Sequence, residues 1–166
     1  MNIKGTTLAI VPLSRANIDE AIELVHSVFP REAKQGIPEV PYWDSLNHTG
    51  LALESNRLEY YVAFENRQII GVTGVFDEKD DTEAAWLGWF CVHPAFRGKG
   101  YGRQILEWTL ALARSYGYKR FVVYTSRDPA ESTAQLLYEK LGLVISSEEI
   151  HPGEPYDIIY REKTIA

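Results

Sequence analysis

The sequence is poor in cysteine and in long hydrophobic runs, and both absences exclude classes of protein. Cys91 is the single cysteine among 166 residues, so neither an intramolecular disulfide nor a zinc site built from several cysteines can form. Alone in an apolar stretch, it is typical of a small buried hydrophobic residue in a reducing compartment. No apolar run approaches the roughly 18 residues of a membrane-spanning helix. The first residues also lack a secretory signal pattern, so we expect a cytoplasmic protein that does not enter a membrane.

Basic residues are fewer than acidic ones. Lysine and arginine number 17 and aspartate and glutamate 23, which gives a net charge of −6 at pH 7. This balance argues against a nucleic-acid partner, because the phosphate backbone attracts basic surfaces, and it mildly favours a cationic substrate. The length of 166 residues suits one ordinary domain, which we expect to span residues 1–166.

The most unusual stretch is residues 97–103, Arg-Gly-Lys-Gly-Tyr-Gly-Arg, where glycines alternate and three residues are cationic. The apolar and aromatic run 84–92 before it predicts a buried strand, and apolar residues at helical spacing follow from Tyr101. Glycines allow a tight turn whose N–H groups point one way, and a helix start adds the positive end of its dipole. A strand, a glycine-rich turn and a helix in this order predict a site for phosphate or pyrophosphate.

Two common phosphate-binding motifs do not fit this stretch. In the Walker motif a lysine follows the last glycine and precedes serine or threonine, whereas Lys99 precedes Gly100, and there is no obvious magnesium ligand. In the dinucleotide motif the third glycine comes one residue later than Gly102 does here. That motif also lies in a βαβ unit, whereas the strands before this turn are expected to form hairpins. We therefore expect neither a Walker-type nucleotide site nor a nicotinamide cofactor.

Periodicity and turn residues predict the order β-α-α-β-β-β-α-β-α-β-β, an α/β (α+β) domain around one mixed sheet. The sheet is expected to be mostly antiparallel, with a parallel pair where the glycine-rich turn feeds its helix back to the next strand. The predicted strands are 6–12, 58–65, 68–76, 84–92, 119–126, 143–150 and 156–162, and the acidic run 77–83 is expected to be a solvated hairpin loop. The predicted helices begin after Asn17, with Glu20 completing a capping box, within 43–53, at Tyr101, and after Asp128.

The helix after Asp128 has the clearest boundaries. Asp128 suits the N-cap, Pro129 suits the first helical position, and Glu131 lies three residues after the cap. Apolar residues at helical spacing give this helix a core face, and Tyr138 lies at the edge of that face. In the first long helix, His26 lies beside the apolar face, and we expect it to be a structural residue.

Two segments resemble the GNAT superfamily of N-acetyltransferases. Residues 92–102, Val-His-Pro-Ala-Phe-Arg-Gly-Lys-Gly-Tyr-Gly, are similar to its Arg/Gln-x-x-Gly-x-Gly/Ala signature with the upstream Val-x-Pro. Residues 134–143, Ala-Gln-Leu-Leu-Tyr-Glu-Lys-Leu-Gly-Leu, are similar to its second motif, a helix with Ala-x-x-x-Tyr-x-x-x-Gly before a final strand. The predicted element order also resembles the family over nearly the whole chain, including its helix-flanked central sheet.

The resemblance implies a cofactor site for acetyl-CoA, the acyl donor. Its pyrophosphate would lie on the backbone N–H groups of the turn, with the cationic side chains assisting by charge, and its pantetheine arm would pair with the strand that precedes the turn and splays from its parallel neighbour. The cofactor-binding residues implied are Phe90, Cys91, Val92, Arg97, Gly98, Lys99, Gly100, Tyr101, Gly102 and Arg103. In the family, a tyrosine at the position of Tyr138 protonates the thiolate that leaves.

The base that would take the proton of the amine is not evident. An alkylammonium with a pKa near ~10.4 leaves about one molecule in a few thousand neutral at pH 7, so the proton must be removed. Related enzymes often place a carboxylate or histidine on the fourth strand, but residues 84–92 contain no ionisable group except Cys91. Glu83 and Asp77 are the nearest candidates, with a water chain as the alternative. Glu131 stands where many relatives have asparagine.

Three functions remain open from the sequence. The first is direct acetyl transfer, in a ternary complex, to the primary amine of a small molecule. The second is acetylation of a protein lysine or N-terminus, and the third is a non-catalytic module that binds acyl-CoA. The proline-broken segment 30–57 and the acidic hairpin are expected to hold the acceptor, and Trp86, Trp89 and Tyr124 are either pocket or core residues. The terminal strands leave an edge for pairing, so the chain is expected to be a monomer or a homodimer.

Overall fold

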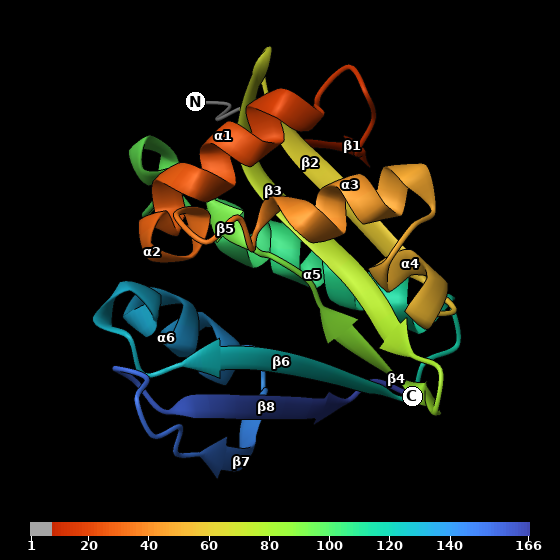
Figure 1. Cartoon of the computed structure of the whole chain (residues 1–166), viewed down its shortest axis with the longest axis vertical. Helices are drawn as coiled ribbons and strands as arrows, with labels where there is room; N and C mark the ends of the chain where they lie inside the picture. The colour runs from red at the N-terminus through yellow and green to blue at the C-terminus, as the bar shows by residue number, and fades with distance from the viewer. Residues whose placement is uncertain (1–7) are drawn as a thin grey trace, which may run out of the picture.

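A computed structural model describes residues 8–166, in which eight strands form one sheet with helices on both faces (Figure 1). The order across the sheet is β1-β2-β3-β4-β6-β8-β7, and β5 pairs with β3 beside this path. The strands are β1 (Ala9–Pro12), β2 (Leu58–Glu65), β3 (Gln68–Glu78), β4 (Asp81–Leu87), β5 (Cys91–Val92), β6 (Arg120–Ser126), β7 (Val144–Glu149) and β8 (Ile158–Thr164). Between described strands, β4 and β6 pair in parallel and the remaining pairs are antiparallel. The mixed, mostly antiparallel sheet predicted from the sequence is confirmed.

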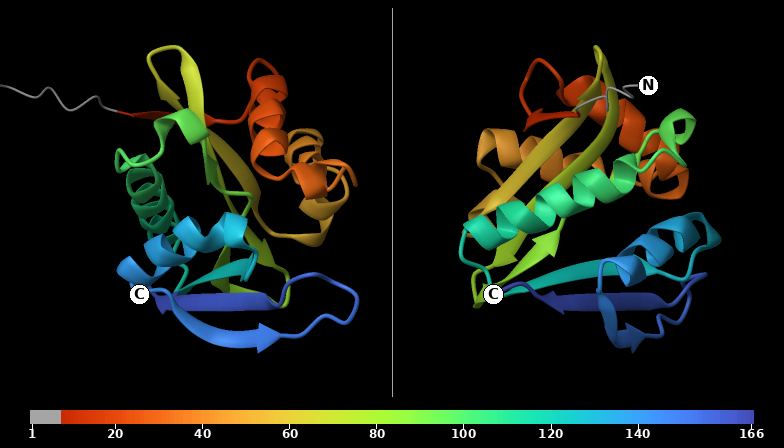
Figure 2. Two further views of the ribbon diagram at one scale, coloured as in Figure 1. Left: turned by 90° about the vertical axis from the view of Figure 1, so that its left-hand side faces the viewer. Right: turned by 180° about the vertical axis from the view of Figure 1, so that it is seen from behind.

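The helices cover the two faces unequally. Four of them lie over the first half of the sheet, and the other two cover its opposite face (Figure 2). Those over the first half are α1 (Ile18–Val28), α2 (Pro30–Ala33), α3 (Glu39–Asn47) and α4 (Leu51–Glu54). The others are α5 (Tyr101–Ser115) and α6 (Ser132–Lys140), and short 3-10 turns η1 (Pro94–Phe96) and η2 (Pro129–Glu131) precede them. None of the helices in the described part of the chain is long and apolar enough to cross a membrane.

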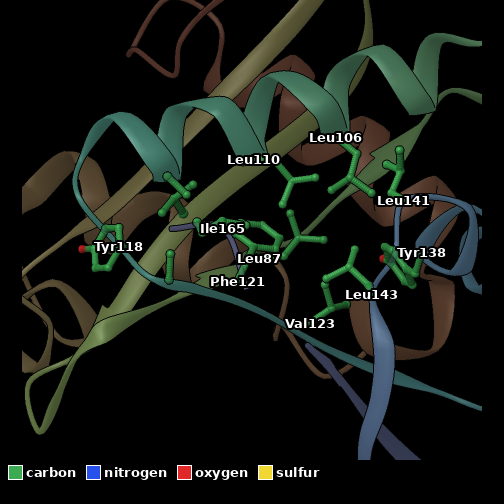
Figure 3. Packing of buried hydrophobic residues seen from close by; sticks show 13 residues of the cluster. Leu87, Leu106, Leu110, Tyr118, Phe121, Val123, Tyr138, Leu141, Leu143 and Ile165 are labelled. Carbon is green, nitrogen blue, oxygen red and sulfur yellow. The ribbon is translucent and has the colours of Figure 1, made fainter. Parts of the chain in front are cut away.

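The core is built from apolar side chains on both faces. On one side, Ile18 and Val25 of α1 are buried with Val62 and Val72 of the sheet. On the other side, the apolar stripe of α5 packs with residues of β4, β6 and α6 (Figure 3). The burial of these stripes, rather than helix propensity, stabilises the two layers.

Two helix starts differ from the predicted caps. Asn17 precedes α1, but its side chain accepts from the Ser14 N–H at 2.8 Å, and Glu20 accepts from the Ile69 N–H at 3.4 Å, so the predicted capping box is wrong. A local partner binds the Asn17 side chain, and a partner on the sheet binds that of Glu20. Asp128 does cap, accepting from the Ala130 N–H at 2.9 Å, but it caps η2, and α6 begins only at Ser132.

Two predicted element boundaries also move. The predicted helix 43–53 is two helices, because His48 adopts a left-handed φ of 54° that ends α3, and the Asp44 carboxylate accepts from the Leu51 N–H to begin α4. The first strand is described from Ala9, and the predicted residues 6 and 7 lie outside the described part of the chain.

The acidic run 77–83 is not a solvated loop. β3 continues to Glu78 and β4 begins at Asp81, so only two residues form the turn. Asp77 is 3% exposed and accepts from the backbone N–H groups of Asn56 and Arg57 and from the Tyr118 hydroxyl. These three hydrogen bonds offset the cost of burying the carboxylate.

Candidate functional site

The predicted strand 84–92 is interrupted by a bulge that opens the sheet. Leu87 of β4 pairs with Val75 of β3, and Cys91 of β5 pairs with Val72, so β4–β5 has one residue more than β3 over this interval. Such a bulge bends a strand away from its neighbour. β4 pairs with β6 from Ala84 to Trp86, whereas β6 continues to Ser126 beside β8. The strand therefore splays from its parallel neighbour as predicted, and β5 and β6 diverge in Figure 1.

The glycine-rich turn lies directly after β5 and begins α5. Gly98 and Gly100 have φ values of 75° and 82°, which favour glycine, and no described atom lies within 4 Å of a Cβ built on either. The first hydrogen bond into the helix runs from the Gln104 N–H to the Gly100 carbonyl, at 3.1 Å. Helix geometry leaves the N–H groups of the first turn without intrahelical partners, and the dipole is positive there. The turn thus has the open surface and polarity that an anion requires.

The predicted cations surround this turn. Arg97 Nε donates to the Val92 carbonyl at 3.1 Å, and Lys99 Nζ lies 5.2 Å from the centroid of the Phe96 ring. Arg103 Nε donates to Glu107 Oε1 at 2.9 Å, an exposed pair along the helix. The structure brings the predicted cations and glycines together at one helix start. The Val92 carbonyl, predicted to pair with the pantetheine arm, instead accepts from the Arg97 side chain.

Tyr138 lies on α6, the helix whose Leu137 reaches the start of α5. A Cβ on Gly102 would lie 3.4 Å from Val92 Cγ2 and 3.5 Å from Leu137 Cδ2, so α5, β5 and α6 meet there. Tyr138 is 4% exposed and packs among apolar residues (Figure 3), a more buried position than the edge of the helix face that the periodicity predicted.

The hydroxyl of Tyr138 is available for chemistry. It has no hydrogen-bond partner among the described residues, and burial together with the negative charge of Glu131 raises its pKa. The phenol therefore stays protonated at neutral pH and can donate a hydrogen bond or a proton.

Glu131 occupies the end of β6 where the sheet opens. Its carboxylate accepts from Thr125 Oγ1 at 3.1 Å and from Ser126 Oγ. Burial raises its pKa, which the hydrogen bonds from Ser126 and Thr125 partly oppose. The sequence identified this residue as the third after the Asp128 cap and as a departure from a family pattern, and the structure gives its carboxylate a defined place beside β6.

The other two predicted carboxylates lie away from the glycine-rich turn. Glu83 Oε1 accepts from Lys119 Nζ at 2.7 Å, at the end of β4 opposite to β5. Asp77 lies five residues along β3 from Val72, the partner of Cys91, a separation of about 17 Å in an extended strand. The structure does not bring Glu83 or Asp77 to the turn or to Tyr138.

Cys91 and the candidate pocket aromatics are also placed. Cys91 is buried, and burial raises the pKa of its thiol to about 12, so it is not a thiolate at neutral pH. Trp86 stacks on Phe76 across the sheet, with ring centroids 6.0 Å apart, while Tyr124 is 55% exposed. Trp89, between β4 and β5, meets Phe29 edge-on at 4.9 Å and lines a cavity of about 360 Å3 beside α3 and α4.

A family sequence profile and solved structures match this chain. The profile described as the acetyltransferase (GNAT) domain matches residues 56–144, which include the glycine-rich turn and Tyr138. No match to a curated protein sequence is found. A protein assigned to the GNAT family from Desulfovibrio desulfuricans aligns with a TM-score of 0.79 and 19% identity, over 96% of this chain and 100% of that one.

Two further solved structures carry information on donor and acceptor. A Salmonella typhimurium protein solved with its cofactor acetyl-CoA aligns with a TM-score of 0.66 and 17% identity, over 96% of this chain and 94% of that one. The Escherichia coli ribosomal-protein-S18-alanine N-acetyltransferase aligns with a TM-score of 0.68 and 15% identity, over 96% and 95%. At these identities the likeness establishes a shared fold.

Proposed function

The chain belongs to the GNAT acetyltransferase family, whose profile matches more than half of it, and we propose that it acetylates the primary amine of a small molecule. As a member, it is an N-acetyltransferase that uses acetyl-CoA as acyl donor. The observation that carries the proposal is the convergence of β5, the start of α5 and α6, the helix that carries Tyr138, beside the opened sheet. Donor, acceptor and proton donor would meet there.

The residues present fit the donor. The pyrophosphate would be held by the N–H groups of the turn around Gly98, Gly100 and Gly102, since two of these glycines face open space at positive φ. Arg97 and Lys99 add positive charge beside them. The backbone of residues 90–92, apart from the Val92 carbonyl that Arg97 occupies, would pair with the pantetheine arm, beyond the point where β4 stops pairing with β6.

Tyr138 is proposed as the proton donor. When bound, acetyl-CoA supplies an activated acetyl group, and formation of the amide bond breaks its C–S bond. The Tyr138 hydroxyl holds a proton that no described residue shares, in an apolar environment where hydrogen bonds are strengthened. Donation of that proton to the departing sulfur would complete the transfer.

Water is proposed to carry away the proton of the amine. Glu83 is bound to Lys119, and the carboxylate of Asp77 already accepts three hydrogen bonds in the core. Both lie at the end of their strands away from β5. A water chain to solvent, the alternative that the sequence left open, needs no side chain at this position.

Release of coenzyme A tests the proposed function. Purified protein with acetyl-CoA is assayed against a panel of monoamines, polyamines, amino acids, aminoglycosides and peptides, and release above the background hydrolysis is expected with at least one small amine. Release with peptides alone would transfer the activity to the protein-acceptor class, to which the Escherichia coli neighbour belongs by its name. Mass spectrometry of a treated lysate then identifies the acetylated site.

A further inference from the structure

A shallow cavity of about 360 Å3, widely open to solvent, lies between the helical layer and the interruption of the fourth strand. Its lining residues are Gln35, Gly36, Ile37, Val40, Pro41, Leu51 and Trp89, which come from α3, α4, the loop before α3 and the segment between β4 and β5. Trp89 directly precedes residues 90–92, so the cavity ends beside the strand proposed to hold the acyl donor. Its volume lies at the small end of the range for ligand sites.

The cavity wall is almost entirely apolar. Ile37, Val40 and Leu51 are between 42% and 46% exposed, which is unusual for large aliphatic side chains that have no partner to cover them. The amide of Gln35 is the one polar side chain among the lining residues. Burial of an apolar ligand group against such a wall is favourable. Its apolar side chains offer no hydrogen bond or opposite charge to an ammonium group.

Two carboxylates lie beside this wall. Glu39 Oε2 is bonded to His26 Nε2 at 2.5 Å, which fixes α3 against α1, and Glu39 Oε1 lies 3.6 Å from the position that a Cβ on Gly36 would occupy. Asp44 Oδ2 accepts from the N–H of Leu51 at 3.0 Å. Because Gly36 and Leu51 line the cavity, negative charge lies at its margin and favours an ammonium group there.

We propose that this cavity binds the acceptor and selects a monoamine with a compact apolar body, an arylalkylamine or a branched alkylamine. The inference rests on the proposed function and narrows its substrate class. The apolar body would lie against Ile37, Val40 and Leu51, with the amine near Trp89 and the donor strand. Polyamines and aminoglycosides are disfavoured, because they have no compact apolar body with which to cover Ile37, Val40 and Leu51.

Amine preference and binding are measured separately. With saturating acetyl-CoA, kcat/KM for 2-phenylethylamine and isoamylamine is expected to exceed that for spermidine and kanamycin at least tenfold. Calorimetric titration of 2-phenylethylamine into the protein with coenzyme A reports binding without turnover. Saturable binding with no turnover of any amine would support the cavity and refute the proposed function. A preference for spermidine or kanamycin, or the absence of saturable binding, would overturn the inference.

Two variants of α4 separate the cavity from the rest of the protein. Leu51→Asn keeps the side-chain size and makes a lining residue polar, and it is expected to raise KM or Kd for 2-phenylethylamine about tenfold. Leu53→Asn is the matched control, since Leu53 is 63% exposed on the same helix and is not a lining residue. KM for acetyl-CoA should stay unchanged in both. Equal effects of the two substitutions on the amine would overturn the inference.

Discussion

The Tyr138 ring is buried among apolar residues, and its hydroxyl has no hydrogen-bond partner among the described residues. Its oxygen is not among the buried polar atoms without a partner in the described residues, which belong to Tyr42, Arg57 and Trp86, so solvent or a ligand can reach it. Phenylalanine keeps the ring and its packing, so Tyr138→Phe should leave stability nearly unchanged. The residue is therefore suited to a clean test of catalysis.

We expect Tyr138→Phe to lower kcat by about 100-fold, the usual contribution of a positioned acid. The Kd of acetyl-CoA, measured by calorimetry, should not change, because the ring and the glycine-rich turn are intact. Steady-state release of coenzyme A gives kcat. Full activity in this variant, together with normal binding, would remove Tyr138 from the mechanism.

Glu83 tests the water route for the amine proton. Its carboxylate is bound to Lys119 on the surface, and Lys119 in turn has a raised pKa through that hydrogen bond. Glu83→Gln is expected to keep kcat within twofold and to leave the rise of kcat/KM with pH in place, because the amine and not Glu83 sets it. A tenfold loss, or a shifted pH profile, would restore Glu83 as the base.

Cys91 is expected to be unreactive in the folded protein. Burial raises the pKa of the thiol from 9.0 to about 12, so the thiolate fraction near pH 8 falls by roughly a thousandfold relative to an exposed thiol. A chromogenic disulfide reagent should label the native protein far more slowly than the protein in guanidinium chloride. Rapid native labelling would show that Cys91 is accessible, and acetyl transfer through an acyl-cysteine would then need testing.

At the scale of elements, the turn before α5 depends on glycine at a left-handed φ. Gly100→Val is expected to abolish measurable binding of acetyl-CoA, because the branched side chain projects into the open space in front of the N–H groups and strains the turn.

A second glycine provides the matched control for this substitution. Gly117 has a φ of 88° and also faces open space, but it follows α5 at the opposite end. Gly117→Val should cost a comparable amount of stability and keep normal binding. Normal acetyl-CoA binding in a folded Gly100→Val protein would mean that the pyrophosphate lies elsewhere.

The sequence predicts those elements whose signals are local. The α5 helix from Tyr101 and the hairpin of β2 and β3 follow from periodicity and turn residues, and a helix that returns to the sheet implies the parallel β6. The bulge after Leu87 follows instead from tertiary contacts. A Cβ on Gly88 would lie 2.7 Å from the Tyr60 hydroxyl oxygen, a contact between distant segments.

Part of the candidate site could likewise be predicted from local sequence signals, and part could not. The glycine-rich turn and Tyr138 stand in short motifs with fixed spacing, so they could be found from the sequence. The cavity proposed for the acceptor is assembled from residues 35–51 and Trp89, and the pair of His26 and Glu39 joins two helices across a segment broken by prolines. No periodic pattern connects these residues, and only packing brings them together. The prediction that Asp77 lies in a solvated loop was wrong for a related reason. A charged residue in an acidic run is usually exposed, but tertiary contacts bury this one.

At the scale of the whole molecule, the two halves of the sheet pair directly over a short interval and are also joined by α5. Parallel pairing between β4 and β6 covers three residue pairs, Ala84 to Trp86, and α5 packs against β3 of one half and β6 of the other. The proposed donor site lies where the halves diverge, between β5 on one side and α6 on the other. A ligand that binds there stabilises the folded state, because the unfolded chain has no site for it.

Acetyl-CoA is therefore expected to raise the melting temperature of the whole chain. At 100 times its Kd, a ligand adds about 2.7 kcal/mol to the free energy of unfolding. For a domain of this size that corresponds to an increase of roughly 5–10 °C. Scanning calorimetry with and without acetyl-CoA measures the shift, with Gly117→Val as a control that should still show it and Gly100→Val as one that should not. The absence of a shift in the unaltered protein, or an equal shift in Gly100→Val, would contradict the proposed donor site.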